Sequence, residues 1–206
     1  MTENELRRKV TSIAEGYARA GNVITGSAAL QKIIDTYNAY RPLARNLPYS
    51  YKLGGWCEVF ADTCFIEAGL AELILVEMGP WEAMQDAKNK GIWKAKGAYI
   101  PKPGDKIYYA YEMSDKTYQY HVGLVTNSDE TVVYSTEGNV QDRVLMLAHK
   151  PNAKEILGYI APDYASLATP ELIPITELPA APKANGTYFM GAVVSNNKVV
   201  YDWIKK

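Results

Sequence analysis

The stretch His121-Val122-Gly123-Leu124-Val125-Thr126, followed by Thr131-Val132-Val133-Tyr134-Ser135-Thr136-Glu137, decides the fold class of this chain. Both segments are rich in β-branched and aromatic residues, which favour strands. The short polar segment 127–130 between them predicts a tight connection and therefore an antiparallel hairpin. Three further strands are expected, at 106–111, 143–148 and 156–160.

Upstream of this hairpin the apolar residues recur at helical rather than strand spacing. Thr2 and Glu5 fit a capping box at the start of the first helix, because a hydroxyl and a carboxylate three residues apart can satisfy each other's free backbone N–H groups. Further helices are expected to begin near Ser27, at Trp56-Cys57 and at Pro80. Helices followed by an antiparallel sheet define the α+β class.

Composition changes after the last predicted strand. Residues 165–187 contain four prolines among many Ala, Thr and Glu, which is typical of a linker. Residues 188–206 predict a short hairpin around Ser195-Asn196-Asn197, or the remnant of a longer tail. We therefore expect one folded domain over 1–164, a linker over 165–187 and a C-terminal hairpin or tail remnant over 188–206.

The composition excludes several classes of protein. The chain has 206 residues, 48% of them hydrophobic, a formal net charge of −1, and only 2 Cys and 2 His. A chain of this apolar content builds a core, and its near-zero charge gives no electrostatic footprint for nucleic acid. So few Cys and His predict neither repeated zinc sites nor a disulfide scaffold. No cofactor is expected, and the oligomeric state is left open.

Neither a targeting segment nor a membrane span is recognisable. The start, Met1-Thr2-Glu3-Asn4, leads into a polar segment without an apolar signal core, and the longest apolar runs are too short for a bilayer. We expect synthesis in a cytoplasm without a signal peptide, no membrane insertion, and export by another route.

The two cysteines differ in context. They lie seven residues apart on one predicted helix, which separates their Cα atoms by roughly 10 Å, too far for a disulfide. Cys64 falls among apolar residues and is interpreted as an inert core thiol. Cys57 falls in the first turn, where free N–H groups and the helix dipole stabilise a thiolate, so it is the candidate nucleophile. Glu58, an adjacent carboxylate, opposes thiolate formation.

A nucleophilic cysteine needs a base, and the chain offers two histidines. His149 lies in a predicted polar turn and is interpreted as a surface residue. His121 begins a strand, so its backbone is held by the core. In an antiparallel hairpin the following strand returns beside this position, which brings Glu137 or Asn139 near His121. A carboxylate or amide there would orient the imidazole.

Four motifs in this order resemble a CHAP domain (cysteine, histidine-dependent amidohydrolase/peptidase) of the kind found in bacteriophage and prophage lysins. They are Trp56-Cys57 before a helix ending Glu67-Ala68-Gly69-Leu70, Pro101-Lys102-Pro103-Gly104-Asp105-Lys106-Ile107, His121-Val122-Gly123-Leu124-Val125 and Thr136-Glu137-Gly138-Asn139. The resemblance runs from about residue 5 to 164, including the closing Gly158-Tyr159-Ile160-Ala161-Pro162-Asp163-Tyr164.

The resemblance implies a papain-like fold, with the nucleophile helix packed on an antiparallel sheet, and cleavage of amide bonds in bacterial peptidoglycan. It implies Cys57 as nucleophile, His121 as base, and Glu137 with Asn139 as the polar groups that orient His121. The backbone N–H of Cys57 would form half of an oxyanion hole. Tyr51 is the candidate for substrate contact and the second donor. Delivery to the wall would follow holin-type lysis or a phage-like particle.

Two features depart from the family or invite another interpretation. Glu58 stands where such domains carry a small or apolar residue, and residues 47–56 contain none of the acids through which some of these lysins bind calcium, so no metal is expected. Asp105 is tempting as a catalytic carboxylate, but its Pro-Gly-Asp context favours a turn residue.

Three functions stay open at this level. A cysteine peptidase acting on proteins would use the same residues, and so would either an amidase or an endopeptidase acting on peptidoglycan. A non-enzymatic wall-binding module would keep the fold without the activity, although every candidate catalytic residue is present.

Overall fold

The structure, a computed structural model, describes residues 1–169, 171–172, 188–195 and 198–205. These fall into two compact units. The larger unit is Arg7–Asp163, and the smaller consists of Met1–Leu6 with Tyr164–Lys206. The larger unit contains all of the candidate site residues.

Four helices and four 3-10 turns precede or connect the strands, at α1 (Glu3–Ala20), α2 (Ala28–Ala39), η1 (Ala44–Asn46), η2 (Tyr51–Leu53), α3 (Cys57–Ala68), η3 (Ala71–Leu73), α4 (Pro80–Asn89) and η4 (Tyr164–Ser166). The capping box is confirmed, because Thr2 N–H donates to Glu5 Oε2 at 2.8 Å and Glu5 N–H to Thr2 Oγ1 at 3.3 Å. Ser27 caps α2 through its hydroxyl, as its position predicted.

The larger unit holds one antiparallel sheet of six strands in the order β1-β6-β2-β3-β4-β5. The strands are β1 (Trp93–Ala95), β2 (Lys106–Glu112), β3 (Tyr118–Ser128), β4 (Val133–Val140), β5 (Arg143–His149) and β6 (Ile156–Ile160). The predicted hairpin is β3 and β4, and the α+β class is confirmed. Strand β1 was not predicted, because three residues are too few to show the alternation of apolar and polar side chains that marks a strand.

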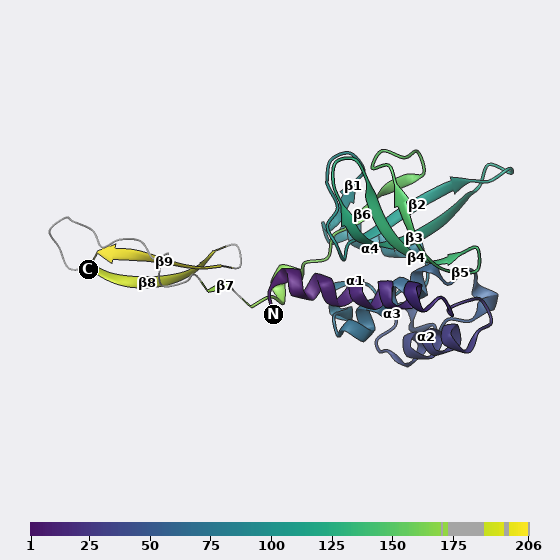
Figure 1. The fold of residues 1–206 in the computed structure, drawn as a ribbon, viewed down its shortest axis with the longest axis horizontal. Helices are drawn as coiled ribbons and strands as arrows, with labels where there is room; N and C mark the ends of the chain where they lie inside the picture. The colour runs from purple at the N-terminus through teal and green to yellow at the C-terminus, as the bar shows by residue number, and fades with distance from the viewer. Residues whose placement is uncertain (170, 173–187, 196–197, 206) are drawn as a thin grey trace. The chain divides into compact units, whose positions relative to one another are not determined.

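Helix α3 forms the centre of the larger unit. It packs against α2 and against β3 and β4, and Figure 1 shows α2 and α3 together on one side of the sheet. Every residue from Cys57 to Phe65 is buried, so the helix is covered on all sides. Gly138 on β4 permits this approach, because a Cβ there would lie 2.6 Å from Phe60 Cβ.

The smaller unit carries a hairpin and a short added strand. Strands β8 (Tyr188–Ser195) and β9 (Lys198–Lys205) pair antiparallel, which confirms the predicted C-terminal hairpin, and β7 (Glu171–Leu172) pairs parallel with β9. Most of the predicted linker, 165–187, and the turn at Asn196-Asn197 lie outside the described residues. In the part of the chain that the structure describes, no helix has the length and apolar content needed to span a bilayer.

Candidate active site

Cys57 is the first residue of α3, so its predicted place in the first turn is confirmed. The first intrahelical hydrogen bond runs from Phe60 N–H to Trp56 C=O at 2.9 Å, which leaves the N–H of Cys57 without an intrahelical acceptor. The preceding glycine loop is held by Tyr49, whose hydroxyl donates to the Gly54 carbonyl at 2.8 Å. The thiol is therefore presented at the positive end of a buried, rigid helix.

His121 lies on β3, where its side chain and that of Cys57 line one cleft. Burial lowers the pKa of His121, but interaction with Cys57 and with Glu137 outweighs it and raises that pKa to about 10. The imidazole is thus held as a cation at neutral pH, between a thiol and a carboxylate. Such an arrangement stabilises a thiolate beside a proton donor.

Glu137 on β4 is the carboxylate that orients His121. His121 Nε2 and Glu137 Oε2 are 2.8 Å apart, as the hairpin topology predicted. The glutamate side chain lies across Gly123 on β3, where a Cβ would come within 2.5 Å of Glu137 Cγ. The glycine in the His121-Val122-Gly123 motif therefore has a packing role: it leaves room for the carboxylate that binds the histidine two residues earlier.

Four side chains, one from each of four strands, meet around this carboxylate. Together with Glu137 we call them the histidine cluster: Tyr109, His121, Ser135, Glu137 and His149. Tyr109 and Ser135 donate their hydroxyls to Glu137 Oε1 at 2.7 and 2.5 Å. His149 Nε2 lies 2.8 Å from the same oxygen. Although Glu137 is buried, these donors and His121 hold the pKa of its carboxyl well below its usual range.

The interpretation of His149 as a surface residue was wrong. His149 ends strand β5 instead of lying in a turn, and its side chain is only 13% exposed. Its ring packs on the Tyr109 ring with centroids 5.1 Å apart. The neighbouring Lys150 and Pro151 suggested a turn, and a sequence window does not show that β5 runs beside Glu137.

A cleft of about 420 Å³ opens over the thiol and the imidazole. Its wall contains Asn139, which lies at a β-bulge of β4 in a left-handed conformation with φ of 61°. Among the described residues no hydrogen bond joins Asn139 to His121. Other residues that line the cleft are Arg45, Leu47, Leu53, Met78, Glu82 and Tyr120.

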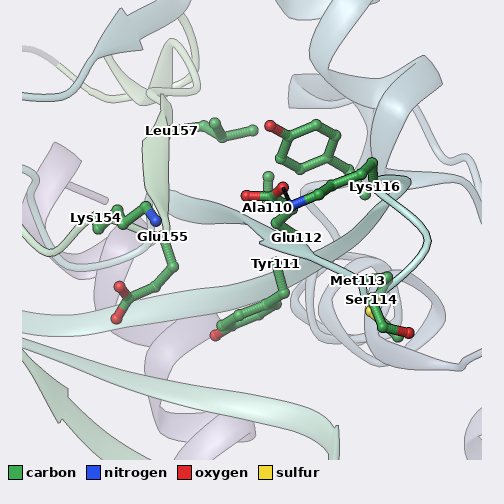
Figure 2. A pocket seen from close by; sticks show the side chains of 10 residues that line it. Ala110, Tyr111, Glu112, Met113, Ser114, Lys116, Lys154, Glu155 and Leu157 are labelled. Carbon is green, nitrogen blue, oxygen red and sulfur yellow. Dashed lines mark hydrogen bonds and ion pairs between the residues drawn. The ribbon is translucent and has the colours of Figure 1, made fainter.

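Two neighbouring hollows extend this cleft. One, of about 230 Å³, shares Gln119, His121 and Asn139 with it and reaches Tyr111. The other, of about 580 Å³, also includes Tyr111 and lies between the β2–β3 hairpin and the start of β6. Figure 2 shows its mixed lining, in which Tyr111 lies beside the carboxylate of Glu155. Cys57 and His121 thus line the cleft, and His121 also lines the first of these neighbouring hollows.

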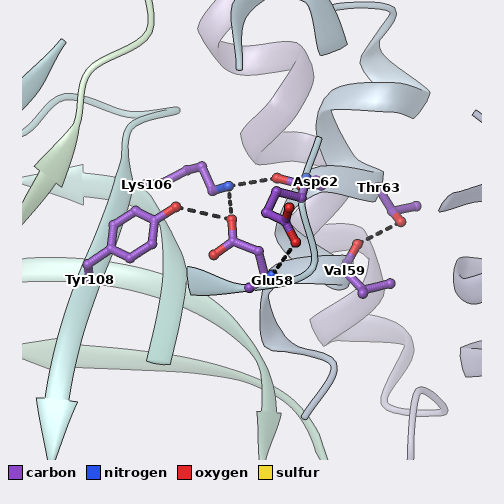
Figure 3. Close-up of polar contacts among 8 residues, drawn as sticks. Glu58, Val59, Asp62, Thr63, Lys106 and Tyr108 are labelled. Atoms are coloured by element: carbon purple, nitrogen blue, oxygen red, sulfur yellow. Dashed lines mark hydrogen bonds and ion pairs between the residues drawn. The ribbon is translucent and has the colours of Figure 1, made fainter. Parts of the chain in front are cut away.

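Glu58, the carboxylate next to the thiol, points into the protein core. It belongs to a second group, which we call the core cluster: Glu58, Asp62, Lys106 and Tyr108 (Figure 3). Lys106 Nζ forms ion pairs with Glu58 and with Asp62. Burial raises the pKa of Glu58 despite the attraction of Lys106, and the carboxylate that the sequence places next to the thiol is paired inside the core instead.

Two further candidate residues have other surroundings. Tyr51 lies in η2, is 44% exposed and packs edge-on against Tyr49, and it is not among the residues that line the cleft. Asp105 is buried in an ion pair with Arg7 at 2.8 Å and accepts the Lys102 backbone N–H, which fits the predicted turn role. Cys64 is a buried core thiol, as expected.

The fold and site define an α+β protein in which a cysteine and a histidine line one cleft and a buried glutamate pairs with the histidine. Within the described ranges no group of three or more His, Cys, Asp or Glu side chains is placed to hold a metal ion. Comparison with known proteins found no matching family model, curated protein or solved structure.

Proposed function

We propose that the chain is a cysteine hydrolase that cleaves an amide bond of bacterial peptidoglycan. The observation that carries the proposal is that Cys57 and His121 line one cleft while Glu137 Oε2 lies 2.8 Å from His121 Nε2. A thiol at a helix start, an imidazolium and a buried carboxylate are the parts that acyl transfer by a cysteine requires.

The chemistry follows from this geometry. The Cys57 thiolate attacks the amide carbonyl, and the backbone N–H of Cys57, without an intrahelical acceptor, stabilises the oxyanion. His121 then gives its proton to the leaving amine, and the acyl group stays on the sulfur. His121 next removes a proton from water, which releases the acid and restores the thiolate. Asn139 lies on the cleft wall, where its amide can contact the substrate.

The choice of peptidoglycan rests on the resemblance to CHAP domains. With it we propose a papain-like arrangement, supported by the packing of the nucleophile helix α3 on β3 and β4. The linked hollows on both sides of His121 also favour a polymeric substrate over a small one. A phage or prophage lysin, released to the wall by holin-type lysis or a phage-like particle, is the corresponding source.

The test is to incubate the protein separately with purified peptidoglycan and with a denatured protein, and to measure new free amines. We expect release from peptidoglycan that is abolished in Cys57→Ala. Cys64→Ala is the matched control, because it removes the other thiol of the same helix. Cleavage of the protein substrate alone would favour a cysteine peptidase instead. Wall binding without cleavage would favour a binding module, and activity that survives Cys57→Ala would refute the mechanism.

Mass spectrometry of the released fragments identifies the bond. Fragments carrying a whole peptide stem without sugar indicate an amidase. Fragments with new termini inside the stem or cross-bridge indicate an endopeptidase. Both use the same three residues, so the fragments and not the site geometry decide between them.

A further inference from the structure

Glu137 is shared by two histidines that approach it from opposite sides of β4. His121 comes from β3 and His149 from β5, and each places Nε2 at 2.8 Å from the carboxylate. These are the only two histidines of the chain. Only one of them, His121, lies on the wall of the cleft that contains Cys57.

The two carboxylate oxygens have different partners. Oε1 accepts hydrogen bonds from Tyr109, Ser135 and His149, whereas Oε2 is paired with His121. Three donors converge on this one oxygen and hold the carboxylate in one orientation. The second oxygen, Oε2, is consequently directed at His121. The Glu137 side chain is only 1% exposed.

We propose that His149 is a positioning residue for the reaction, acting on His121 through Glu137. This rests on the proposed cysteine hydrolase function. The donated hydrogen bond keeps the buried carboxylate ionised and aimed, and the aimed carboxylate keeps His121 protonated and turned toward Cys57. A hydrophobic side chain at position 149 would pack on β5 equally well, but it would remove one of the three hydrogen bonds to Glu137 Oε1.

The other groups around Glu137 support this assignment. The titratable groups that face it are Tyr109 and Tyr111 from β2, His121 from β3 and His149 from β5. None of these four residues carries a carboxyl group, so no second carboxylate competes with Glu137 for the His121 imidazolium. His149 and His121 are the two groups among these able to carry a positive charge.

The test compares His149→Leu with His149→Gln, whose amide keeps a donor at similar reach. We expect His149→Leu to lower kcat on peptidoglycan about tenfold to hundredfold with KM little changed, the range for one hydrogen bond to a charged group. His149→Gln should recover most of this loss. Met146→Ala, an exposed position on the same strand, is the control for an unspecific effect on β5.

A second readout does not depend on catalysis. The imidazole ¹⁵N signals of His121 can be followed over pH, and in His149→Leu only one histidine remains, which assigns them. We expect the pKa of His121 to fall by about one unit in His149→Leu and to return in His149→Gln. Where the leucine variant does not fold, His149→Asn, which is polar but too short to reach Oε1, replaces it.

The outcomes separate the two proposals. An unchanged His121 titration in a folded His149→Leu protein overturns the positioning role, whatever the activity. A wild-type protein that cleaves no peptidoglycan overturns the proposed function, and the titration still decides the role of His149. A shifted titration with a matching loss of kcat supports both.

Discussion

Glu58 and Glu137 are both buried carboxylates, the first next to Cys57 in the chain and the second paired with His121, yet their pKa values move in opposite directions. The pKa of Glu58 is raised, whereas that of Glu137 is lowered. Burial alone would raise both. The difference therefore lies in the partners that each carboxylate meets, in the core cluster for Glu58 and in the histidine cluster for Glu137.

The partners differ in number and in charge. Glu58 accepts from Lys106 and Tyr108 on Oε1, its Oε2 has no hydrogen-bond partner among the described residues, and it competes with Asp62 for one ammonium group. Glu137 uses both oxygens and competes with no other acid. A carboxylate stays charged in a protein core where donors outnumber acids, and becomes harder to ionise where acids outnumber cations.

The largest effect is expected for Glu137→Gln. An amide does not stabilise an imidazolium, so His121 loses its orientation and its charge. We expect kcat/KM on peptidoglycan to fall by about 10⁴-fold, the size of the loss when a serine-protease triad loses its orienting acid. Steady-state kinetics on the soluble fragments measure this. Glu58→Gln is the matched control and should keep activity near the wild-type value; equal losses in both variants would remove the distinction between the clusters.

Lys106→Met tests the core cluster. It leaves two buried carboxyls without a cation, and we expect a loss of about 3–5 kcal/mol in the free energy of unfolding, measured in urea. Lys116→Met is the control, because Lys116 lies on the surface and is 82% exposed. A stability equal to the wild type would show that the ion pairs do not hold the core cluster together.

The pH dependence of this loss has a definite sign. Burial, against the attraction of Lys106, raises the pKa of Asp62 to about 7. A carboxyl with a raised folded-state pKa contributes stability that is complete below its unfolded pKa and is lost as pH rises through about 7. Without Lys106, ionisation of the buried Asp62 carboxyl costs more free energy. The Lys106→Met protein should therefore be most destabilised at high pH.

Gly123→Ala tests the packing beneath the histidine cluster. The added Cβ would lie 2.5 Å from Glu137 Cγ, so the carboxylate must move away from His121. We expect a loss of about tenfold to hundredfold in kcat/KM, comparable to the loss of one charged hydrogen bond. Gly16→Ala is the control, because nothing lies within 4 Å of its added Cβ and alanine favours the helix. Full activity in Gly123→Ala would show that the position of the Glu137 carboxylate does not control activity.

The smallest effect is the alkaline limit of activity. His121 must be protonated to release the amine, and its pKa is raised to about 10. Its charged form is fully present below the unfolded value of about 6.5 and is lost as pH rises through about 10, so kcat/KM should decline there. The limit should move to lower pH in Glu137→Gln. A pH–rate profile measures both, and an identical limit in the two proteins would contradict the coupling.

Local chemistry was enough for the helices, the main strands and the place of Cys57. Capping residues such as Ser27, the period of the apolar residues and the Gly-Gly-Trp sequence before Cys57 act over a few residues, so the sequence determined them. The hairpin likewise placed Glu137 beside His121, because two consecutive antiparallel strands bring the end of the second next to the start of the first.

The remaining features depend on contacts between elements distant in the chain. Whether Glu58 faces the thiol or the core depends on Lys106, 48 residues away. Whether His149 is a surface residue or a partner of Glu137 depends on β5 lying against β4. The sequence by itself determined which residues could react. Which carboxylate pairs with His121 and which with Lys106 follows from tertiary contacts, because folding sets the donors and competing acids around each one.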